Sequence, residues 1–210
     1  MAYFPFYIDL KGRKCLVVGG GKVALRKIRT LLQFGAEVVV IGSLVSDEIR
    51  LLAEIGRLTY EIRPYQYGDV AGFFLAIAAT SAPEINDRVC RDSLKLNVWA
   101  DSATDPEKGS FIFPAVVKKR ELVVGVTSSG KFPALTRLLK QKIAALPLLT
   151  QAGSLESWAA WRRRLQKEVG DPQERARILR AAGGEILKAP EAEPGDIIAR
   201  IAGAKSNEKN

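Results

Sequence analysis

The sequence contains no histidine, which excludes imidazole acid–base catalysis and any histidine metal site. Proton transfer must therefore fall to carboxylates, lysines, tyrosines, hydroxyl groups or water. There are two cysteines, Cys15 and Cys90, and neither has a partner at metal-ligand spacing, so we expect two buried free thiols and no metal site. No apolar run approaches the roughly 20 residues of a membrane span, and the N-terminus lacks a signal-peptide pattern. These absences predict a cytoplasmic protein that does not bind membranes.

Positive charge is in excess, with 32 Lys and Arg against 23 Asp and Glu and a formal net charge of +9. Such a balance predicts an anionic partner. A multiply charged acidic small molecule explains the charge as well as nucleic acid does. Because the basic residues are spread along the chain and no nucleic-acid-binding motif is present, we expect no nucleic-acid partner.

Residues 14–24, KCLVVGGGKVA, place an apolar run before three glycines and a segment with helical spacing. The pattern is G-x-G-x-x-A, in which Gly19 allows a sharp turn, Gly21 lets a pyrophosphate approach the backbone, and Ala24 lets the helix pack closely on the strand. The N-terminus of the helix adds free N–H groups and a partial positive charge. The pattern predicts a dinucleotide site formed by Gly19, Gly20, Gly21, Lys22, Val23 and Ala24.

Apolar strands alternate with amphipathic helices through the first hundred residues, which predicts a doubly wound parallel sheet of the Rossmann type. The expected strands are 15–18, 37–41, 58–62, 73–78 and 98–100, the expected helices are 23–34, 46–55 and 83–94, and residues 4–10 are expected to add an edge strand. Small residues after two strands are expected to complete the cofactor site: Gly42, Ser43, Ala79 and Thr80. The second strand ends without the acidic residue that often binds the ribose hydroxyls and without an Arg for a 2′-phosphate, so this edge leaves NAD and NADP open.

Beyond Asp101 the pattern changes. Residues 111–117 and 121–127 predict two antiparallel strands, because no crossover helix fits between them. A polar loop at 128–131 precedes a helix at 133–145, and the rest is helical, including segments around residues 158–165, 173–182 and 194–201. The cluster of Trp158, Trp161 and the arginines that follow is interpreted as a packed helix with a solvated face.

Four segments together resemble the precorrin-2 dehydrogenases, the NAD-dependent enzymes of siroheme synthesis that also form the N-terminal part of siroheme synthase. They are CLVVGGGKVALRK (15–27), LAIAAT (75–80), FIFPA (111–115) and VGVTSSGKFPAL (124–135). The segments occur in the family's order and near its spacing, and they cover roughly residues 1–145. Only their combination is specific.

The resemblance implies an NAD-binding Rossmann domain at 1–110, a dimerisation region of strands and a helix at 111–147 and a helical C-terminal domain at 148–204. The polar composition of the end of the chain predicts a disordered tail at 205–210. It implies a homodimer that oxidises the tetrapyrrole precorrin-2 to sirohydrochlorin with NAD. Some family members also insert ferrous iron. The many carboxylates of precorrin-2 suit a basic protein.

The family also implies a catalytic aspartate after the fifth strand, in a stretch like N-V-x-D-x-P-E. Two alignments place it differently. If residues 97–98 are the family's N-V, the position is Asp101. If the spacing is counted back from Phe111 without gaps, the position is Thr104, and Asp105 is then the nearest carboxylate. We favour Asp101; the structural alternative is that both carboxylates only cap a turn.

The polar loop offers Ser128, Ser129 and Lys131 as ligands for substrate carboxylates, through hydroxyl, backbone and ammonium donors. A simple strand-to-helix turn explains the same residues. A rival to the enzyme is a regulatory domain that senses a dinucleotide without turnover. The FIFPA and SSGKFPAL segments speak against it, since a sensor needs neither.

Overall fold

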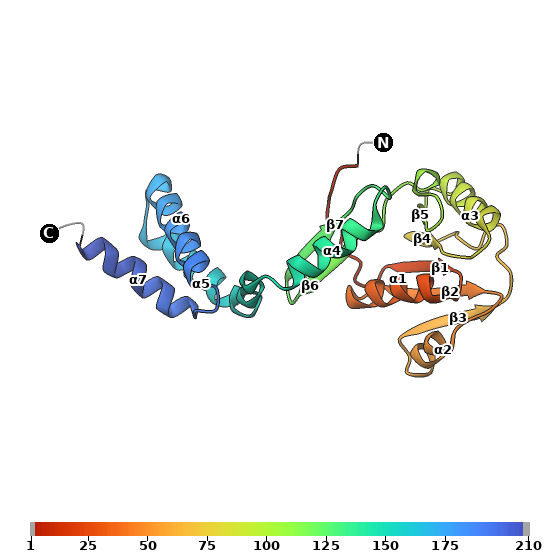
Figure 1. Ribbon diagram of the computed structural model, residues 1–210, viewed down its shortest axis with the longest axis horizontal. Coiled ribbons are helices and arrows are strands. Elements are labelled where there is room, and N and C mark those ends of the chain that lie inside the picture. The colour runs from red at the N-terminus through yellow and green to blue at the C-terminus, as the bar shows by residue number, and fades with distance from the viewer. Residues whose placement is uncertain (1–2, 208–210) are drawn as a thin grey trace. The chain divides into compact units, whose positions relative to one another are not determined.

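The computed structural model describes residues 3–207 (Figure 1). The chain divides into two compact units, one formed by Met1–Ala115 with Thr127–Thr136 and the other by Val116–Val126 with Arg137–Asn210. The chain therefore passes from one unit to the other three times.

A five-stranded parallel sheet forms the centre of the first unit. Its strands are β1 (Lys14–Val18), β2 (Glu37–Gly42), β3 (Leu58–Ile62), β4 (Leu75–Ala78) and β5 (Trp99–Ser102). They lie in the order β3-β2-β1-β4-β5, which confirms the predicted Rossmann-type topology. Val18 lies opposite both Ile41 and Ala78, and Ala78 lies opposite Ser102, so the carboxyl ends of these strands meet at one edge.

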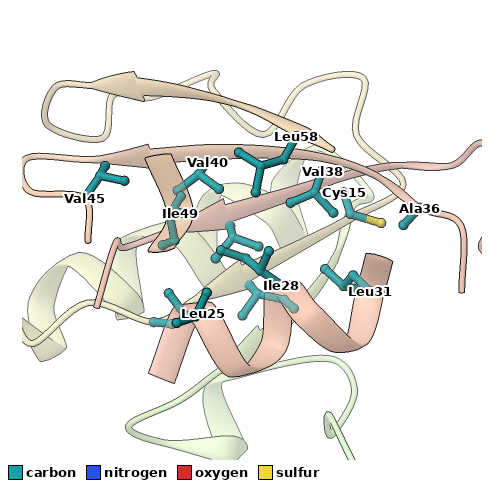
Figure 2. Packing of buried hydrophobic residues seen from close by; sticks show 14 of the residues in the cluster. Cys15, Leu25, Ile28, Leu31, Ala36, Val38, Val40, Val45, Ile49 and Leu58 are labelled. Carbon is teal, nitrogen blue, oxygen red and sulfur yellow. The ribbon is translucent and has the colours of Figure 1, made fainter. Parts of the chain in front are cut away.

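Three helices cover the sheet: α1 (Lys22–Gln33), α2 (Asp47–Glu54) and α3 (Pro83–Lys95). Alternate residues of β1 point to opposite faces, as the two-residue period of a strand requires. Cys15 and Val17 join the core cluster that contains α1 and α2 residues, whereas Leu16 and Val18 join the cluster that contains α3 residues. Figure 2 shows Ile28 and Leu31 of α1 pointing toward the strand residues on the first face.

Helix α1 ends just before a glycine, Gly35. This glycine has a φ of 73°, and its N–H donates to the Leu32 carbonyl while the N–H of Ala36 donates to the Leu31 carbonyl. This pair of bonds is the Schellman arrangement, which satisfies the last carbonyls of a helix. The chain then enters β2 directly.

The edge strand predicted at residues 4–10 is wrong. These residues form no strand and belong to neither of the described sheets, and Phe4 is 83% exposed. The Phe6 ring instead packs edge-on against Trp99, with the centroids 5.4 Å apart. This segment therefore contacts β5 through an aromatic ring.

The strand predicted from residue 111 begins four residues later. The Phe111 N–H donates to the Ala100 carbonyl, the Phe113 N–H donates to the Asp101 carboxylate, and Pro114 has no N–H. Because the N–H groups of Phe111 and Phe113 bind β5 and Pro114 has none, residues 111–114 do not pair in the hairpin. The hairpin consists of β6 (Ala115–Lys119) and β7 (Leu122–Val126), and its two-residue connection requires the predicted antiparallel pairing.

Helices make up the rest of the chain. They are α4 (Pro133–Ala144), the 3-10 segment η2 (Pro147–Ser154), α5 (Leu155–Glu168), α6 (Pro172–Lys188) and α7 (Pro194–Asn207). Trp161 and Leu165 of α5 pack with Ile178 of α6 and Ile197 of α7, and the arginines at 162–164 are exposed, as predicted. Residues 205–207 of the expected disordered tail belong to α7, and residues 208–210 lie outside the described residues. No helix among residues 3–207 is long and apolar enough to cross a membrane.

Candidate active site

The turn after β1 is built from glycines that neighbouring backbone requires. Gly19 has a φ of 123°, and a Cβ there would lie 2.3 Å from the Ala79 carbonyl oxygen. A Cβ on Gly20 would lie 2.0 Å from the Leu44 carbonyl oxygen, and one on Gly42 would lie 3.1 Å from the same oxygen. The ends of β1, β2 and β4 are thus pressed together with no room for side chains.

Gly21 differs from these glycines, because a Cβ on it would meet nothing within 4 Å. Its backbone is extended and it precedes the first residue of α1. The position faces open space, as expected of a glycine that a ligand approaches. No neighbouring atom of the fold therefore requires glycine at this position.

The first turn of α1 suits an anion. Its N–H groups have no acceptor within the helix, and no side chain caps them. The turn contains no acidic residue, and the exposed Lys22 stands first. A cation at the N-terminus of a helix is unfavourable by itself and favourable once a phosphate is bound. Val23 is partly exposed beside it, and Ala24 is fully buried against the sheet.

Ser43 and Leu44 follow β2 and are both exposed, and the Gly20 carbonyl accepts a hydrogen bond from the Ser46 N–H. The link fixes this loop to the glycine turn. Ser43 therefore lies directly after the carboxyl end of β2, with neither a carboxylate nor an arginine beside it in the sequence.

Thr80, at the end of β4, is held by a side chain that the sequence analysis missed. Asn86 of α3 is fully buried, and its amide binds both the N–H and the carbonyl of Thr80. The same amide donates to the Thr104 hydroxyl beyond β5. A polar residue on the sheet-facing side of the predicted helix was the available signal.

Asp101, one of the two candidate catalytic carboxylates, is 3% exposed and paired at both oxygens. Its Oδ2 lies 2.6 Å from Nζ of Lys27, and its Oδ1 accepts the Phe113 N–H at 3.0 Å. The Lys27 ammonium lies 4.6 Å from the centroid of the Phe113 ring. Lys27 was also missed by the sequence analysis, although a lysine on the buried face of an amphipathic helix requires a partner.

Asp105, the other candidate, is half-buried. Its Oδ1 accepts the Glu107 N–H at 3.0 Å and so caps the short 3-10 segment η1 (Pro106–Lys108). Its own N–H donates to the Ser102 hydroxyl at 3.2 Å. Among the described residues, no hydrogen bond reaches the second oxygen of Asp105.

The 128–131 loop lies against the same segment. A Cβ on Gly130 would come 2.8 Å from Cγ of Pro106, so the loop backbone packs on η1. The Ser128 hydroxyl accepts bonds from the Phe132 N–H and the Thr136 hydroxyl, each at 3.0 Å, and thereby stabilises the approach to α4. Ser129 is partly buried and Lys131 is exposed. The structure therefore brings Asp105 and the predicted substrate loop together.

Cys15 and Cys90 are free and buried, as predicted. Burial raises the pKa of each thiol to about 12, so both stay protonated at neutral pH. No cluster of three or more metal-ligating acidic or cysteine side chains occurs in the part of the chain that the structure describes.

Residues 6–115 match the model of the NAD_binding_7 family, described as "Putative NAD(P)-binding". The chain belongs to this family. The matched region contains the whole parallel sheet, the glycine turn and Thr80. The predicted dinucleotide fold is thereby confirmed.

Curated proteins named siroheme synthase are also similar to this chain. The siroheme synthase of Photobacterium profundum is 38% identical over 170 residues, which are 80% of this chain and 36% of that protein. Siroheme synthase 1 of Yersinia enterocolitica (serotype O:8 / biotype 1B) is 38% identical over 182 residues, 85% of this chain and 38% of that one. This NAD(P)-binding chain therefore spans little more than a third of these relatives, which confirms the resemblance to part of siroheme synthase.

A solved structure named SirC, precorrin-2 dehydrogenase, has the same fold. It superposes with a TM-score of 0.70 at 22% sequence identity, over 95% of this chain and 99% of that one. The likeness covers the helical C-terminal segments as well as the NAD(P)-binding fold.

Proposed function

We propose that this protein oxidises precorrin-2 to sirohydrochlorin in siroheme synthesis, with NAD as the electron acceptor. One observation carries the proposal. The loop of Ser128 to Lys131 packs on η1 beside Asp105, in the same compact unit as the glycine turn. A dinucleotide sensor has no use for a basic loop and a carboxylate on the same sheet edge. The siroheme synthase relatives and the SirC fold support the same assignment.

The glycine turn fits the cofactor. The backbone at Gly21 and the first turn of α1 would hold the pyrophosphate, Ser43 would hold the adenosine ribose, and the Ala79–Thr80 backbone would border the nicotinamide half. When bound, NAD supplies a two-electron hydride acceptor. No basic residue immediately follows β2 to bind a 2′-phosphate, and we therefore propose NAD rather than NADP.

Oxidation of precorrin-2 releases one hydride and one proton, and the proton requires an acceptor. We propose Asp105 as its acceptor. The Asp101 oxygens are already bound by Lys27 and the Phe113 N–H. Asp105 keeps an oxygen without a hydrogen-bond partner among the described residues and is partly open to solvent. Ser129 and the exposed Lys131 would then orient substrate carboxylates beside it.

We also propose that the protein works as a homodimer in the cytoplasm. The exposed leucines of α4, including Leu135, Leu138 and Leu139 at 42%, 49% and 42%, support a partner subunit on this helix. Two free buried thiols suit a reducing compartment.

The test combines purified protein, precorrin-2 and NAD, and follows the NADH absorbance together with the sirohydrochlorin spectrum. Equal amounts of both products are expected. NAD binding without product would overturn the enzyme assignment in favour of a dinucleotide sensor. Ferrous iron added after completion then measures whether the protein accelerates iron insertion over a protein-free control.

A further inference from the structure

We propose that Asn86 is a positioning residue that holds the cofactor loop after β4 and the reaction loop after β5 in one fixed arrangement. The part of this proposal that concerns catalysis rests on the proposed dehydrogenation. The part that concerns NAD binding does not. Asn86 touches neither candidate catalytic carboxylate and acts through Thr80 and Thr104.

The Asn86 amide uses its full hydrogen-bonding capacity. Its Oδ1 accepts the Thr80 N–H at 3.0 Å and shares the single proton of the Thr80 hydroxyl, at 2.8 Å, with the Ala82 carbonyl, at 3.0 Å. Its Nδ2 donates to the Thr80 carbonyl at 3.1 Å and to the Thr104 hydroxyl at 3.2 Å. Two acceptor sites and two donors are all that an amide has. The orientation of the amide is also fixed, since only its oxygen can face the Thr80 N–H.

The two bonds to the Thr80 backbone replace the bonds that a neighbouring strand would make. A strand partner binds both the N–H and the carbonyl of one residue, and Asn86 does the same with a single side chain. The residue before Thr80 is Ala79, and its carbonyl oxygen would lie only 2.3 Å from a Cβ on Gly19. The position of Thr80 therefore fixes the backbone that faces the glycine turn.

The bond to Thr104 extends this control to the reaction loop. The Thr104 hydroxyl lies 3.2 Å from the Ser102 hydroxyl, which in turn accepts the N–H of Asp105 at 3.2 Å. A continuous hydrogen-bonded path thus runs from Thr80 to the backbone of Asp105. An independent backbone bond joins the Ala103 N–H to the Ala78 carbonyl, so loss of the amide loosens the loops without separating the strands.

Removal of the amide leaves the Thr80 peptide without these partners. A buried peptide group without hydrogen-bond partners is unfavourable, so the loop will move until these groups reach water. Since the nicotinamide half of the cofactor borders this loop, NAD affinity will fall. Displacement of Asp105 relative to the substrate lowers turnover separately, because catalysis depends on sub-ångström placement.

The experiment compares Asn86→Ala, Thr104→Val, Thr104→Ser and the double variant Asn86→Ala/Thr104→Val. NAD affinity is measured by calorimetry, kcat with precorrin-2, and thermal stability by calorimetric unfolding. We expect Asn86→Ala to lower NAD affinity and kcat by roughly tenfold or more each. Thr104→Val should lower kcat while NAD affinity stays within about twofold, and Thr104→Ser should retain the wild-type kcat.

The double variant tests the path itself. If Asn86 and Thr104 act through their shared bond, the kcat of the double variant equals that of Asn86→Ala alone. If the two losses multiply, the residues act independently and the proposal is overturned. A purely structural role predicts a lower unfolding temperature with normal kcat and NAD affinity, which also overturns it.

If Asn86→Ala does not fold, Asn86→Asp takes its place, because it keeps the acceptor oxygen and loses both donors. Wild-type NAD affinity and kcat in a folded Asn86→Asp would refute the positioning role. If the wild-type protein does not oxidise precorrin-2, the proposed function fails, and the NAD affinities of the Asn86 variants still decide the cofactor half.

Discussion

Lys27 and Asp101 form a buried ion pair whose energetics separate the two candidate carboxylates. Lys27 is 9% exposed and Asp101 is 3% exposed. A buried charge that loses its counter-charge is strongly destabilising, whereas a solvent-accessible carboxylate is not needed for folding. Substitution at each aspartate should therefore affect different properties of the protein.

Asp101→Asn should lower the free energy of unfolding by about 3 kcal/mol or more, because the Lys27 ammonium is left buried without an anion. Asp105→Asn should leave stability nearly unchanged and lower kcat on the order of a hundredfold, as for loss of a general base. Urea unfolding and steady-state rates distinguish the two. A folded Asp101→Asn protein with normal stability and no turnover would instead identify Asp101 as the base. If neither variant is slower, solvent takes the proton.

Gly20 and Gly21 are adjacent, but substitutions at the two positions are expected to affect different properties, stability and NAD affinity. Gly21→Asp has room for its side chain, so the fold should be retained while NAD affinity falls by well over about tenfold, because a carboxylate would face the phosphates. Gly20→Ala would press a Cβ onto the Leu44 carbonyl and should lower the unfolding temperature. Calorimetric titration with NAD measures the first effect and thermal unfolding the second. Undiminished NAD affinity in Gly21→Asp would remove the pyrophosphate from this turn.

At the scale of elements, the C-terminal helices depend on one buried amide. Gln151 of η2 donates to the carbonyls of Pro190 and Ala192, at 2.7 and 2.9 Å, and accepts the indole N–H of Trp158 at 2.8 Å. Three bonds thus connect η2, α5 and the α6–α7 connection around one side chain that is 8% exposed. Such fully satisfied buried networks specify a single packing.

Gln151→Ala should destabilise the helical segment by about 2 kcal/mol, because two carbonyls and one indole N–H lose their partner. Arg163→Ala, on the exposed face of α5, serves as the control and should change stability by less than about 0.5 kcal/mol. Tryptophan fluorescence during denaturation reports on this region, since Trp158 and Trp161 pack against each other there. Equal midpoints for the two variants would contradict the role given to Gln151.

Elements with clear periodicity were predictable from the sequence, and elements fixed by distant partners were not. The β-branched run of β2 and the glycine after α1 specify their own structure, so their bounds were predicted to within a residue. Residues 111–114 were misassigned because their donors bind β5, a long-range choice that no local pattern contains. Asn86 and Lys27 could be noticed as polar residues on buried helix faces, but their partners Thr104 and Asp101 lie far away in the sequence and were not predictable. The glycine turn was predictable because its geometry depends on the glycines themselves.

At the scale of the whole molecule, the prediction concerns association. We expect a homodimer at micromolar concentration, measured by light scattering, with the β6–β7 hairpin and α4 at the interface. Leu138→Glu, on the exposed face of α4, should shift the protein to the monomer, whereas Leu187→Glu, equally apolar and 70% exposed on α6, should not. A wild-type monomer would contradict the proposed dimerisation region.

The three crossings of the chain between its compact units limit how this protein can be cut or fused. A fragment that stops after Ala115 keeps every strand of the parallel sheet and every glycine of the glycine turn, yet it lacks the loop that packs on Pro106. A fragment extended to Thr136 regains that loop only together with the hairpin of the other unit. No single cleavage yields either unit whole. Recombination between relatives at one crossover point would therefore combine parts of each unit from both parents rather than exchange a whole unit.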